Sequence, residues 1–476
     1  MVVNDVHAML NATTVGNVRR PASVDAVCEI VRSASVRGRA LSIAGGRHAM
    51  GGQQFGTGID LLDMTGLNRV IAFDAERGEI EAEAGIMWPA LIAWLDEAQE
   101  GAPQPWGIIQ KQTGADRLTL GGALASNVHG RVLGRGPIVA DVVAFTLVAA
   151  DGEPRRCSRE ENPELFRLAI GGYGLLGPIV AVRLRLAPRR LMRRDVSILA
   201  VEAVVPALEA RADGRRGYGD FQFAIDPASD DFLHDGICSC YVPVADETPL
   251  PDSQRALSRA DWEALFHLSH TDPRRASDAY TRHYLATDGQ LYWSDRHQLA
   301  DYYEGYHVAL DARLGATAPG SEMISELYVP RGDLPAFMAD VAADFRAHQT
   351  PVIYGTVRLI ERDAETVLAW AREPWACVVF NLHVDHTADG ITRAAEAFRR
   401  SIDRALERGG SYYLTYHRWA RRDQVEAAYP NFVEFLRAKR HHDPEERFQS
   451  DWFRHYRAMF AAELGMTGCQ GVRVSG

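Results

Sequence analysis

A glycine-rich turn that follows a short predicted strand is the feature that most constrains this chain. The strand Leu41-Ser-Ile-Ala44 runs into Gly-Gly-Arg-His-Ala-Met-Gly-Gly, which ends at Gly52. Successive residues of such a turn can direct several backbone N–H groups at one point, an arrangement that suits a diphosphate. His48 adds an imidazole within the turn. We interpret the stretch as a site for a cofactor that carries both a diphosphate and an aromatic ring, namely a flavin.

The length of the chain predicts more than one core. Its 476 residues, 46% of them hydrophobic and 24% charged, favour two domains or one domain with a large insertion. A net charge of −11 argues against nucleic-acid binding as the main function. The sequence shows no apolar run typical of a signal peptide or a membrane span, so we expect a cytoplasmic protein. We expect the six scattered cysteines to be free thiols.

Helix and strand signals in the first part of the chain do not alternate regularly. Ser23 is the expected N-cap of a helix that ends near Gly38. Strands are expected over residues 59–64, 70–73 and 79–84, and a helix over residues 88–98. This order predicts an α+β fold and argues against the doubly wound sheet of a dehydrogenase.

A second glycine-rich segment runs from Thr113 to Gly130. Thr119 is expected to cap a short helix whose small residues allow another backbone or a flat ring to approach closely. The pattern then predicts a strand over residues 140–149, a helix over 164–170 and a strand over 178–186.

Gly172-x-Gly174-x-x-Gly177 matches the dinucleotide fingerprint letter for letter. That motif must follow a strand and open a helix, whereas here a helix is expected before it and a strand after it. The order is reversed, so we expect no nicotinamide site of the Rossmann type.

The rest of the chain is less informative. Residues 195–425 mix strands and helices, and a helix is expected over Val425–Arg437, before a turn-rich close. An aromatic cluster is either the wall of a substrate pocket or the core of a helical flap: Tyr280, Tyr284, Tyr292, Trp293, Tyr302, Tyr303 and Tyr306. A zinc site at His234, Cys238 and Cys240 would need a second ligand pair at zinc spacing, which the sequence lacks. The pair His383 and His386 is equally weak evidence for a metal site. No metal site is predicted.

The glycine turn with His48, the segment from Thr113 to Gly130 and the Gly171–Gly177 stretch before a strand together resemble one known family. This is the FAD-binding domain of the vanillyl-alcohol oxidase and p-cresol methylhydroxylase (PCMH-type) superfamily, with alditol oxidases and decaprenylphosphoryl-ribose oxidases as the nearest likenesses. The likeness covers about residues 15–190 and the last fifty or so. It implies a two-subdomain FAD-binding domain over residues 1–192 and an α+β substrate (cap) domain with an antiparallel sheet over 193–425. Residues 426–476 would return to the FAD-binding domain.

The resemblance also implies which residues hold FAD. Gly45, Gly46, Arg47, His48, Ala49, Gly51 and Gly52 would form the pyrophosphate loop, with His48 bonded to the flavin 8α carbon. Prenyl-ribose oxidases hold their flavin without a covalent bond, so the alternative is that His48 hydrogen-bonds a phosphate. No cysteine occurs in residues 113–135, so the second, cysteinyl bond of some relatives is excluded.

Further FAD contacts are implied by the second glycine segment. They are Thr113, Gly114, Gly122, Ser126, Asn127, His129 and Gly130, with Ile179 on the adenine side. For Ser126 and Asn127 the alternative is helix C-capping.

Removal of a hydride from an alcohol carbon needs a proton acceptor and a group that stabilises the developing oxyanion. The segment Ser411–Trp419 resembles the one that carries a lysine at the flavin of prenyl-ribose oxidases, and Tyr416 stands at that lysine position. The catalytic candidates are His417, Tyr416, Arg358, Asn381 and His383. Strand alternation places Asn381 and His383 on the same face. The alternative for each candidate is an ordinary residue of the sheet surface.

These inferences predict an FAD-dependent oxidoreductase. It would transfer a hydride from a CH–OH group of a polyol, sugar or related small alcohol to the flavin, which O2 or another acceptor would reoxidise. One alternative is a flavin-dependent reductase of a carbon–carbon double bond, as in sterol reductases. Another is a flavoprotein that serves as a binding module. The oligomeric state is left open.

Overall fold

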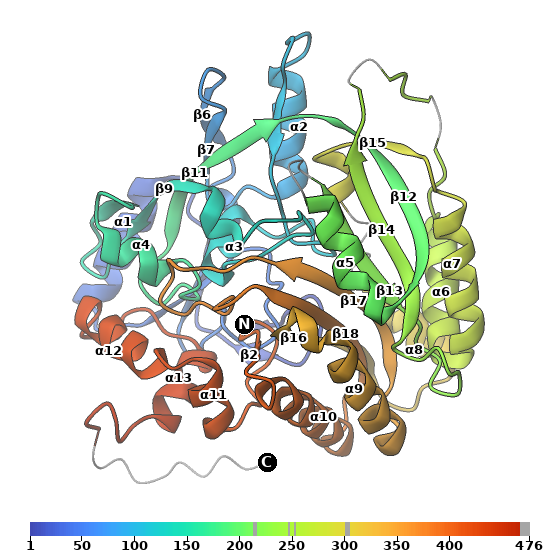
Figure 1. Cartoon of the computed structure of the whole chain (residues 1–476). Helices are drawn as coiled ribbons and strands as arrows, with labels where there is room; N and C mark the ends of the chain where they lie inside the picture. The colour runs from blue at the N-terminus through green and yellow to red at the C-terminus, as the bar shows by residue number, and fades with distance from the viewer. Residues whose placement is uncertain (213–216, 246–247, 252–253, 300–304, 467–476) are drawn as a thin grey trace.

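The computed structural model describes residues 1–212, 217–245, 248–251, 254–299 and 305–466. A small parallel sheet and a larger antiparallel sheet occupy the N-terminal part, drawn in blue to teal at the left of Figure 1. A longer antiparallel sheet crosses the centre and right of the view, and the C-terminal helices lie at the lower left. The architecture is therefore α+β, as the sequence predicted.

The parallel sheet contains the glycine turn. Its strands lie in the order β3 (Val18–Arg19), β5 (Asp60–Asp63) and β4 (Leu41–Ala44). Helix α1 (Val24–Val36) packs beside it through buried Val27 and Val31. The Ser23 side chain accepts a hydrogen bond from the Ala26 N–H at 3.2 Å, which confirms the predicted N-cap. A two-stranded ribbon, β1 (Val2–Val3) with β2 (Thr13–Thr14), precedes the sheet.

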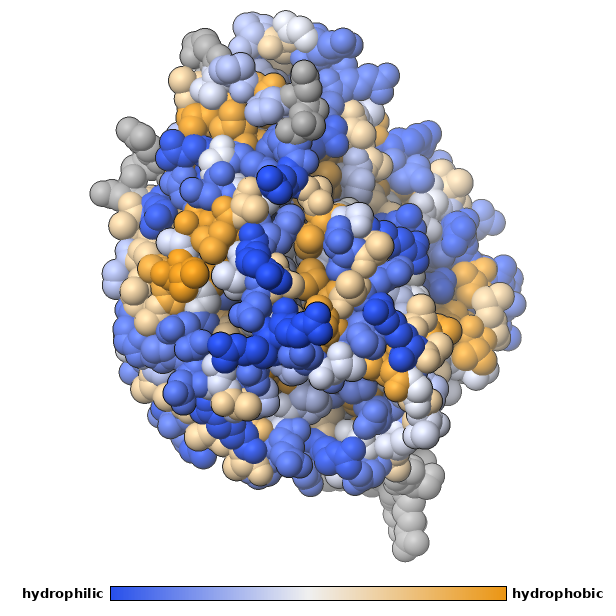
Figure 2. All heavy atoms as spheres, turned by 90° about the vertical axis from the view of Figure 1, so that its right-hand side faces the viewer, coloured by the Kyte–Doolittle hydropathy of each residue, from blue (hydrophilic) through white to orange (hydrophobic). Residues whose placement is uncertain are grey.

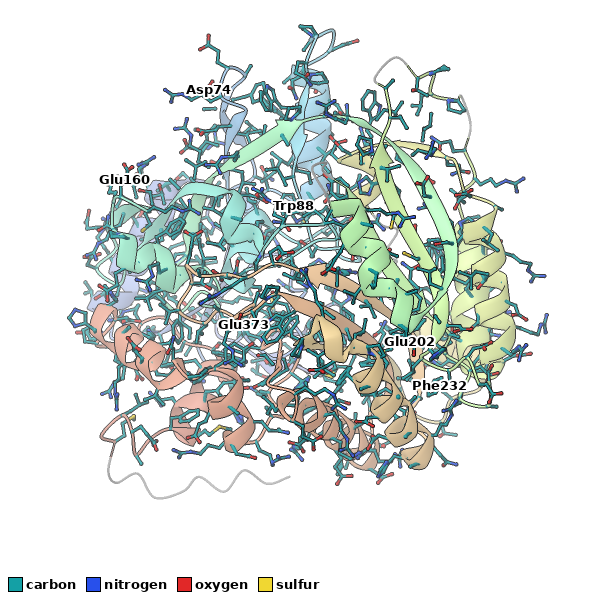
Figure 3. All side chains as sticks on the ribbon, viewed as in Figure 1. Asp74, Trp88, Glu160, Glu202, Phe232 and Glu373 are labelled. Carbon is teal, nitrogen blue, oxygen red and sulfur yellow. The ribbon has the colours of Figure 1, made fainter. Side chains whose placement is uncertain are left out.

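The antiparallel sheet of the N-terminal part has the order β10 (Pro154–Ser158), β9 (Val142–Val148), β11 (Ile179–Pro188), β7 (Glu79–Glu83) and β6 (Val70–Asp74). Strand β8 (Trp106–Ile108) also pairs with β11. Asp74, labelled in Figure 3, marks the outer end of the β6–β7 hairpin. The strand expected from residue 140 begins two residues later, because Ile138–Asp141 forms a 3-10 helix.

The helices of this part match their predicted positions closely. Helix α2 is Trp88–Ala98, α3 is Leu120–Ser126 with Thr119 as N-cap, and α4 is Pro163–Ala169. Helix α4 precedes the Gly171–Gly177 stretch and β11 follows it, so the reversed order predicted for the dinucleotide fingerprint is confirmed.

The central sheet begins at Leu191 and ends at Tyr412. Its order is β15 (Leu291–Trp293), β12 (Leu191–Ala200), β14 (Asp235–Pro243), β13 (Tyr218–Phe223), β17 (Val352–Ile360), β18 (Trp375–Asp385), β16 (Gly320–Pro330) and β19 (Ser411–Tyr412). Helices α5 (Val201–Ala212), α9 (Leu334–His348) and α10 (Ala388–Leu406) pack on its outer face. The N-terminal part shares the inner face with α6 (Arg259–Thr271), α7 (Pro273–Leu285) and α8 (Tyr306–Leu314).

Helices α6 and α7 form the right-hand flank in Figure 1. Figure 2 shows this side of the molecule, on which hydrophilic side chains predominate and apolar ones gather in small patches. Among the described residues of the chain, no helix is long and apolar enough to cross a membrane. The described cysteines, at 28, 157, 238, 240 and 377, are free thiols, as expected.

The C-terminal segment packs against the parallel sheet. The helix expected over Val425–Arg437 is wrong, because α11 (Arg422–Ala428) and α12 (Phe432–His442) are separate helices. Pro430 lies between them and cannot donate a helical hydrogen bond. Before α13 (Asp451–Met459), the Leu41 N–H donates to the Arg447 carbonyl at 2.7 Å and the Gln449 N–H to the Leu41 carbonyl at 2.9 Å. The segment thereby extends the edge of β4.

Candidate functional site

One cavity runs between the glycine turn, helix α3 and the inner face of the central sheet. It encloses about 1290 Å³ including its open mouth. Its walls are mostly apolar. The two glycine-rich segments and residues from β16, β17 and the stretch after β19 all contribute to its lining.

The glycine turn leaves no room for side chains. A Cβ at Gly45 would lie 2.1 Å from Thr119 Oγ1, and one at Gly46 would lie 2.2 Å from the Arg117 carbonyl oxygen. Arg47 adopts φ 61°, a left-handed conformation that is uncommon outside glycine. The turn therefore packs its backbone directly against the start of α3 and presents backbone to the cavity.

His48 lies in the cavity wall and pairs with a second histidine. Its Nδ1 is 2.7 Å from His7 Nε2, and the two ring centroids are 4.8 Å apart. Burial lowers the pKa of His48 to about 4, against a smaller opposing effect of the Arg117 backbone. The ring is therefore neutral near pH 7 and has an unprotonated nitrogen that can act as a nucleophile or an acceptor.

A buried carboxylate forms the centre of the opposite wall. Glu326 of β16 is 3% exposed, and its Oε1 lies 2.6 Å from His129 Nε2. The Tyr416 hydroxyl donates to Oε2 at 3.1 Å, and the Tyr328 hydroxyl donates to Oε1 at 2.5 Å. Burial opposes ionisation, but His129, the hydrogen bond from Tyr328 and the charge of Arg358 outweigh it and lower the pKa of Glu326 to about 2. The carboxylate is therefore negatively charged at neutral pH.

Arg358 of β17 lies in the same wall. Its guanidinium donates a hydrogen bond to Thr113 Oγ1 from the second glycine segment, and its Nε has no hydrogen-bond partner among the described residues. A cation with an unused donor at the cavity can bind an anionic or carbonyl oxygen.

The comparisons with known proteins agree with this geometry. Residues 16–158 match a family model described as "FAD binding domain". L-gulonolactone oxidase of Mus musculus is 30% identical over 171 residues, which cover 36% of this chain and 37% of that protein. Cytokinin dehydrogenase 2 of Arabidopsis thaliana is 30% identical over 192 residues, which cover 39% of this chain and 36% of that protein. L-gulono-1,4-lactone dehydrogenase of Mycobacterium tuberculosis is 26% identical over 214 residues, which cover 45% of this chain and 47% of that protein.

The chain contains a PCMH-type FAD-binding domain. The match supports the predicted likeness to the vanillyl-alcohol oxidase and p-cresol methylhydroxylase superfamily, and the cofactor of this domain is FAD. The matched segments span less than half the length of these relatives.

The cavity suits FAD. The glycine turn offers the bare backbone that a diphosphate needs. Only glycine fits there, because a Cβ atom at Gly45 or Gly46 would collide with Thr119 or Arg117. Gly121, Gly122 and Ala125 of α3 line the cavity and leave a smooth wall for a flat ring.

Most residues predicted to bind FAD line this cavity. They are Gly45, Gly46, Arg47, His48, Ala49, Thr113, Gly114, Gly122, Ser126, His129 and Ile179. The remaining four, Gly51, Gly52, Asn127 and Gly130, are not among its lining residues. Asn127 is instead the C-cap of α3, at φ 48°, and its side-chain amide donates to Asp363 Oδ2 at 2.9 Å. For Asn127 the structure therefore favours the capping alternative.

The predicted catalytic residues separate into two groups. Tyr416 and Arg358 line the cavity. His417 is 2% exposed and stacks on Phe398 with ring centroids 4.6 Å apart, outside the cavity lining. Asn381 and His383 lie on the inner face of β18 but are not lining residues, and His383 faces Glu322 instead. The role of each residue stays a prediction.

Sequence reasoning missed Glu326 and His7. Glu326 had a detectable signal, since Glu322 and Glu326 are carboxylates that share one face of a strand with Ile324 and Tyr328. His7 had none, because its contact with His48 spans 41 residues. The His234, Cys238 and Cys240 set does not converge, since exposed His234 pairs with Glu202 and Asp235 while both cysteines are buried. Glu202 and nearby Phe232 are labelled in Figure 3.

Of the aromatic cluster, Tyr302 and Tyr303 lie outside the described residues. Tyr280 and Tyr284 are joined by a hydroxyl–hydroxyl bond of 3.0 Å, and Arg194 lies over the rings of Tyr284 and Tyr292. None of the described members lines the FAD cavity, which favours a role in packing.

Proposed function

We propose that the protein is an FAD-dependent oxidoreductase that removes a hydride from a CH–OH group of a polyol, sugar or related small alcohol. One observation carries the proposal: Tyr416, ionised Glu326 and Arg358 meet in the same cavity as the glycine turn. This arrangement combines a hydroxyl held by a carboxylate with a cation, the two kinds of group that alcohol oxidation requires.

Bound FAD supplies the hydride acceptor. Tyr416 is positioned to take the proton of a substrate hydroxyl while it passes its own proton to the ionised Glu326, so that the carboxylate is the final proton acceptor. Arg358, tied to Thr113, is positioned to stabilise the negative charge that develops on the substrate oxygen. His129 holds the Glu326 carboxylate in place from the opposite side.

The names of the relatives support a sugar-like substrate. Two of the three act on sugar lactones by name, one as an oxidase and one as a dehydrogenase. Because one relative is an oxidase and the other a dehydrogenase, both O2 and another acceptor are candidates for reoxidising the flavin. The cytokinin dehydrogenase relative extends the substrate panel to amines.

Anaerobic stopped-flow reduction of the bound flavin tests this proposal. Polyols, aldoses and aldonolactones are compared with a cytokinin-type amine and with NADPH. We expect bleaching of the flavin by at least one alcohol or lactone and none by NADPH. Reduction by NADPH alone would favour the reductase of carbon–carbon double bonds. Reduction by the amine alone would contradict a CH–OH donor, and no reduction by any compound would favour the binding module.

We also propose that His48 is covalently bonded to the flavin. Its neutral ring lines the cavity, and His7 contacts Nδ1, which leaves Nε2 as the nitrogen available for a bond. Acid precipitation should leave yellow colour on the polypeptide, and mass spectrometry should place FAD on the peptide that contains His48. Complete release of FAD into the supernatant would contradict the bond without affecting the oxidoreductase proposal.

A further inference from the structure

A cluster of histidines and one glutamate lies farther along β16 from the FAD cavity. It joins His270 of α6, Glu322 of β16 and His383 of β18. Glu322 precedes Glu326 by four residues on the same strand, a distance of about 13 Å in extended chain. We propose that these three side chains form a binding site for a divalent first-row transition metal ion, with Zn²⁺ as the preferred ion. The proposal does not depend on the oxidoreductase activity.

The three candidate ligand atoms form a nearly equilateral triangle. His270 Nε2 lies 3.2 Å from Glu322 Oε1 and 3.3 Å from His383 Nδ1, and His383 Nδ1 lies 3.3 Å from the same oxygen. Ligands about 2.0–2.1 Å from a tetrahedral Zn²⁺ are separated by about 3.3 Å. An octahedral ion with bonds of the same length would separate them by about 2.9 Å. The triangle has the dimensions of one face of a tetrahedral site.

A second group on the same strand serves as a comparison. His129, Glu326 and Cys377 also converge, but His129 Nε2 and Glu326 Oε1 are only 2.6 Å apart. That separation is typical of a charge-assisted hydrogen bond and is too short for two ligands of one ion. The two carboxylates of β16 therefore differ: Glu326 belongs to a hydrogen-bonded pair, whereas Glu322 has the spacing of a ligand.

Contacts behind the triangle orient both imidazoles. The distance from His270 Nδ1 to the Phe266 carbonyl oxygen is 2.8 Å, and because a carbonyl can only accept, Nδ1 carries the proton. Nε2 of the neutral ring then points a lone pair at Glu322 Oε1. His383 Nε2 lies 3.5 Å from Asp385 Oδ1. Histidines that bind metals commonly have their second nitrogen held by a carbonyl or carboxylate in this way.

The glutamate is oriented as well. Its other oxygen, Oε2, accepts a hydrogen bond from the Tyr306 hydroxyl and lies 3.0 Å from His307 Nδ1. Oε1 is left to face the two histidines, and Glu322 is only 4% exposed. Two lone pairs that face each other across 3.2 Å need either a metal ion or an extra proton on His270 between them.

The position of the site suggests what the ion does. None of the described side chains of α6 is fully buried, and Ala276 is the one buried residue of α7. These helices have little core packing of their own to hold them on the sheet. A metal ion shared by His270, Glu322 and His383 would fasten α6 to β16 and β18, with water in the fourth ligand position.

Zinc titration of the tag-free, flavin-loaded full-length protein tests the site. The protein is stripped with a chelator, transferred to chelator-free buffer and titrated with Zn²⁺ in a calorimeter. We expect about one ion per chain and a higher thermal unfolding temperature with Zn²⁺. His270→Ala and Glu322→Gln should each weaken binding at least about 10-fold. His267→Ala, on the same helix but outside the cluster, is the matched control and should bind like the wild type.

Two results would overturn the proposal. One is the lack of saturable Zn²⁺ binding by the wild-type protein, which would indicate a protonated histidine pair in place of the ion. The other is equal affinity in wild type, His270→Ala and Glu322→Gln. Flavin content and circular dichroism check the folding of each variant, and His270→Ala on the outer helix serves if Glu322→Gln does not fold. Zinc X-ray absorption should show two imidazoles and a carboxylate at about 2.0 Å.

Discussion

At the scale of single residues, the FAD cavity brings together groups with opposite requirements. Glu326 is kept charged in a buried place by His129, Tyr328 and Arg358, whereas His48 is kept neutral by burial. A charged carboxylate that holds a tyrosine hydroxyl can organise a substrate, and a neutral imidazole retains a lone pair. Each residue therefore has the ionisation state that its proposed role needs.

Tyr416→Phe removes the hydroxyl that joins Glu326 to the cavity. Because that hydroxyl is proposed to orient the substrate, we expect flavin reduction to slow about 100-fold. FAD content should not change. Anaerobic stopped-flow measurement with the best substrate checks this, and Tyr292→Phe, whose ring lies outside the cavity lining, is the control. An unchanged rate in Tyr416→Phe would exclude the proposed role.

His417 provides a prediction about pH. Burial, with Arg399 nearby, lowers the pKa of His417 to about 3 in the folded chain. The ordinary value of about 6.5 applies after unfolding, so the unfolded state takes up a proton first as the pH falls. The stability that depends on a neutral His417 is complete above pH 6.5 and decreases toward pH 3. The loss should reach about 2 kcal/mol at pH 5.

Urea unfolding at pH 7.5 and pH 5 measures this effect. His417→Gln should lose less stability than the wild type between the two pH values, by about the same 2 kcal/mol. His348→Gln, with a side chain that is 50% exposed, should behave like the wild type. Identical pH dependence of His417→Gln and wild type would show that His417 is protonated in the folded protein.

At the scale of elements, the contact between the glycine turn and the start of α3 determines the shape of the cofactor site. Thr119 caps α3 and also packs against Gly45 of the turn. The turn follows β4, and α3 is held on β11, so two sheets meet at this contact. The proposed diphosphate site is thus formed where the glycine turn and the start of α3 meet, and not by the turn alone.

Gly46→Ala tests the junction. The added Cβ would lie 2.2 Å from the Arg117 carbonyl oxygen, which is backbone and cannot rotate away. We expect a loss of about 1–3 kcal/mol of stability and a lower ratio of flavin to protein, measured by absorbance. Gly332→Ala, where no atom lies within 4 Å of the new Cβ, is the control. Full flavin content in Gly46→Ala would show that the turn can move.

At the scale of the whole molecule, the two ends of the chain stabilise each other. Arg447 is 3% exposed, and its guanidinium donates to the backbone carbonyls of Ala34, at 3.0 Å, and Arg39, near the end of α1. The neighbouring residues extend the edge of β4. The C-terminal segment therefore completes the small parallel sheet from which the glycine turn emerges.

Arg447→Met retains the length of the side chain but removes the donor to the Arg39 carbonyl and one of the two donors to the Ala34 carbonyl, the other being the Arg39 N–H. We expect the free energy of unfolding to fall by about 3 kcal/mol. Arg437→Met, at an exposed position of α12, should change it by less than about 0.5 kcal/mol. Denaturant unfolding followed by circular dichroism measures both. Equal effects of the two substitutions would show that the C-terminal segment contributes little to the parallel sheet.

The predicted elements that agree with the structure have local signals. Ser23 and Thr119 cap their helices as expected, because a side-chain oxygen needs only an N–H three residues ahead. The wrong helix over residues 425–437 shows the limit of periodicity. The helical spacing of apolar residues continues across Pro430, whereas the helical backbone is interrupted there.

The amino-acid sequence by itself determined the cofactor and the backbone that faces it, because glycines, caps and strand alternation act between near neighbours. Only the tertiary structure decided which charged side chains meet. Glu326 reaches His129 across 197 residues, His48 reaches His7 across 41, and Glu322 faces histidines from three other elements. Such contacts depend on strand register and sheet order, which leave no periodic trace in the sequence. The glycine turn could be recognised before the fold was seen, whereas the carboxylate opposite it could not.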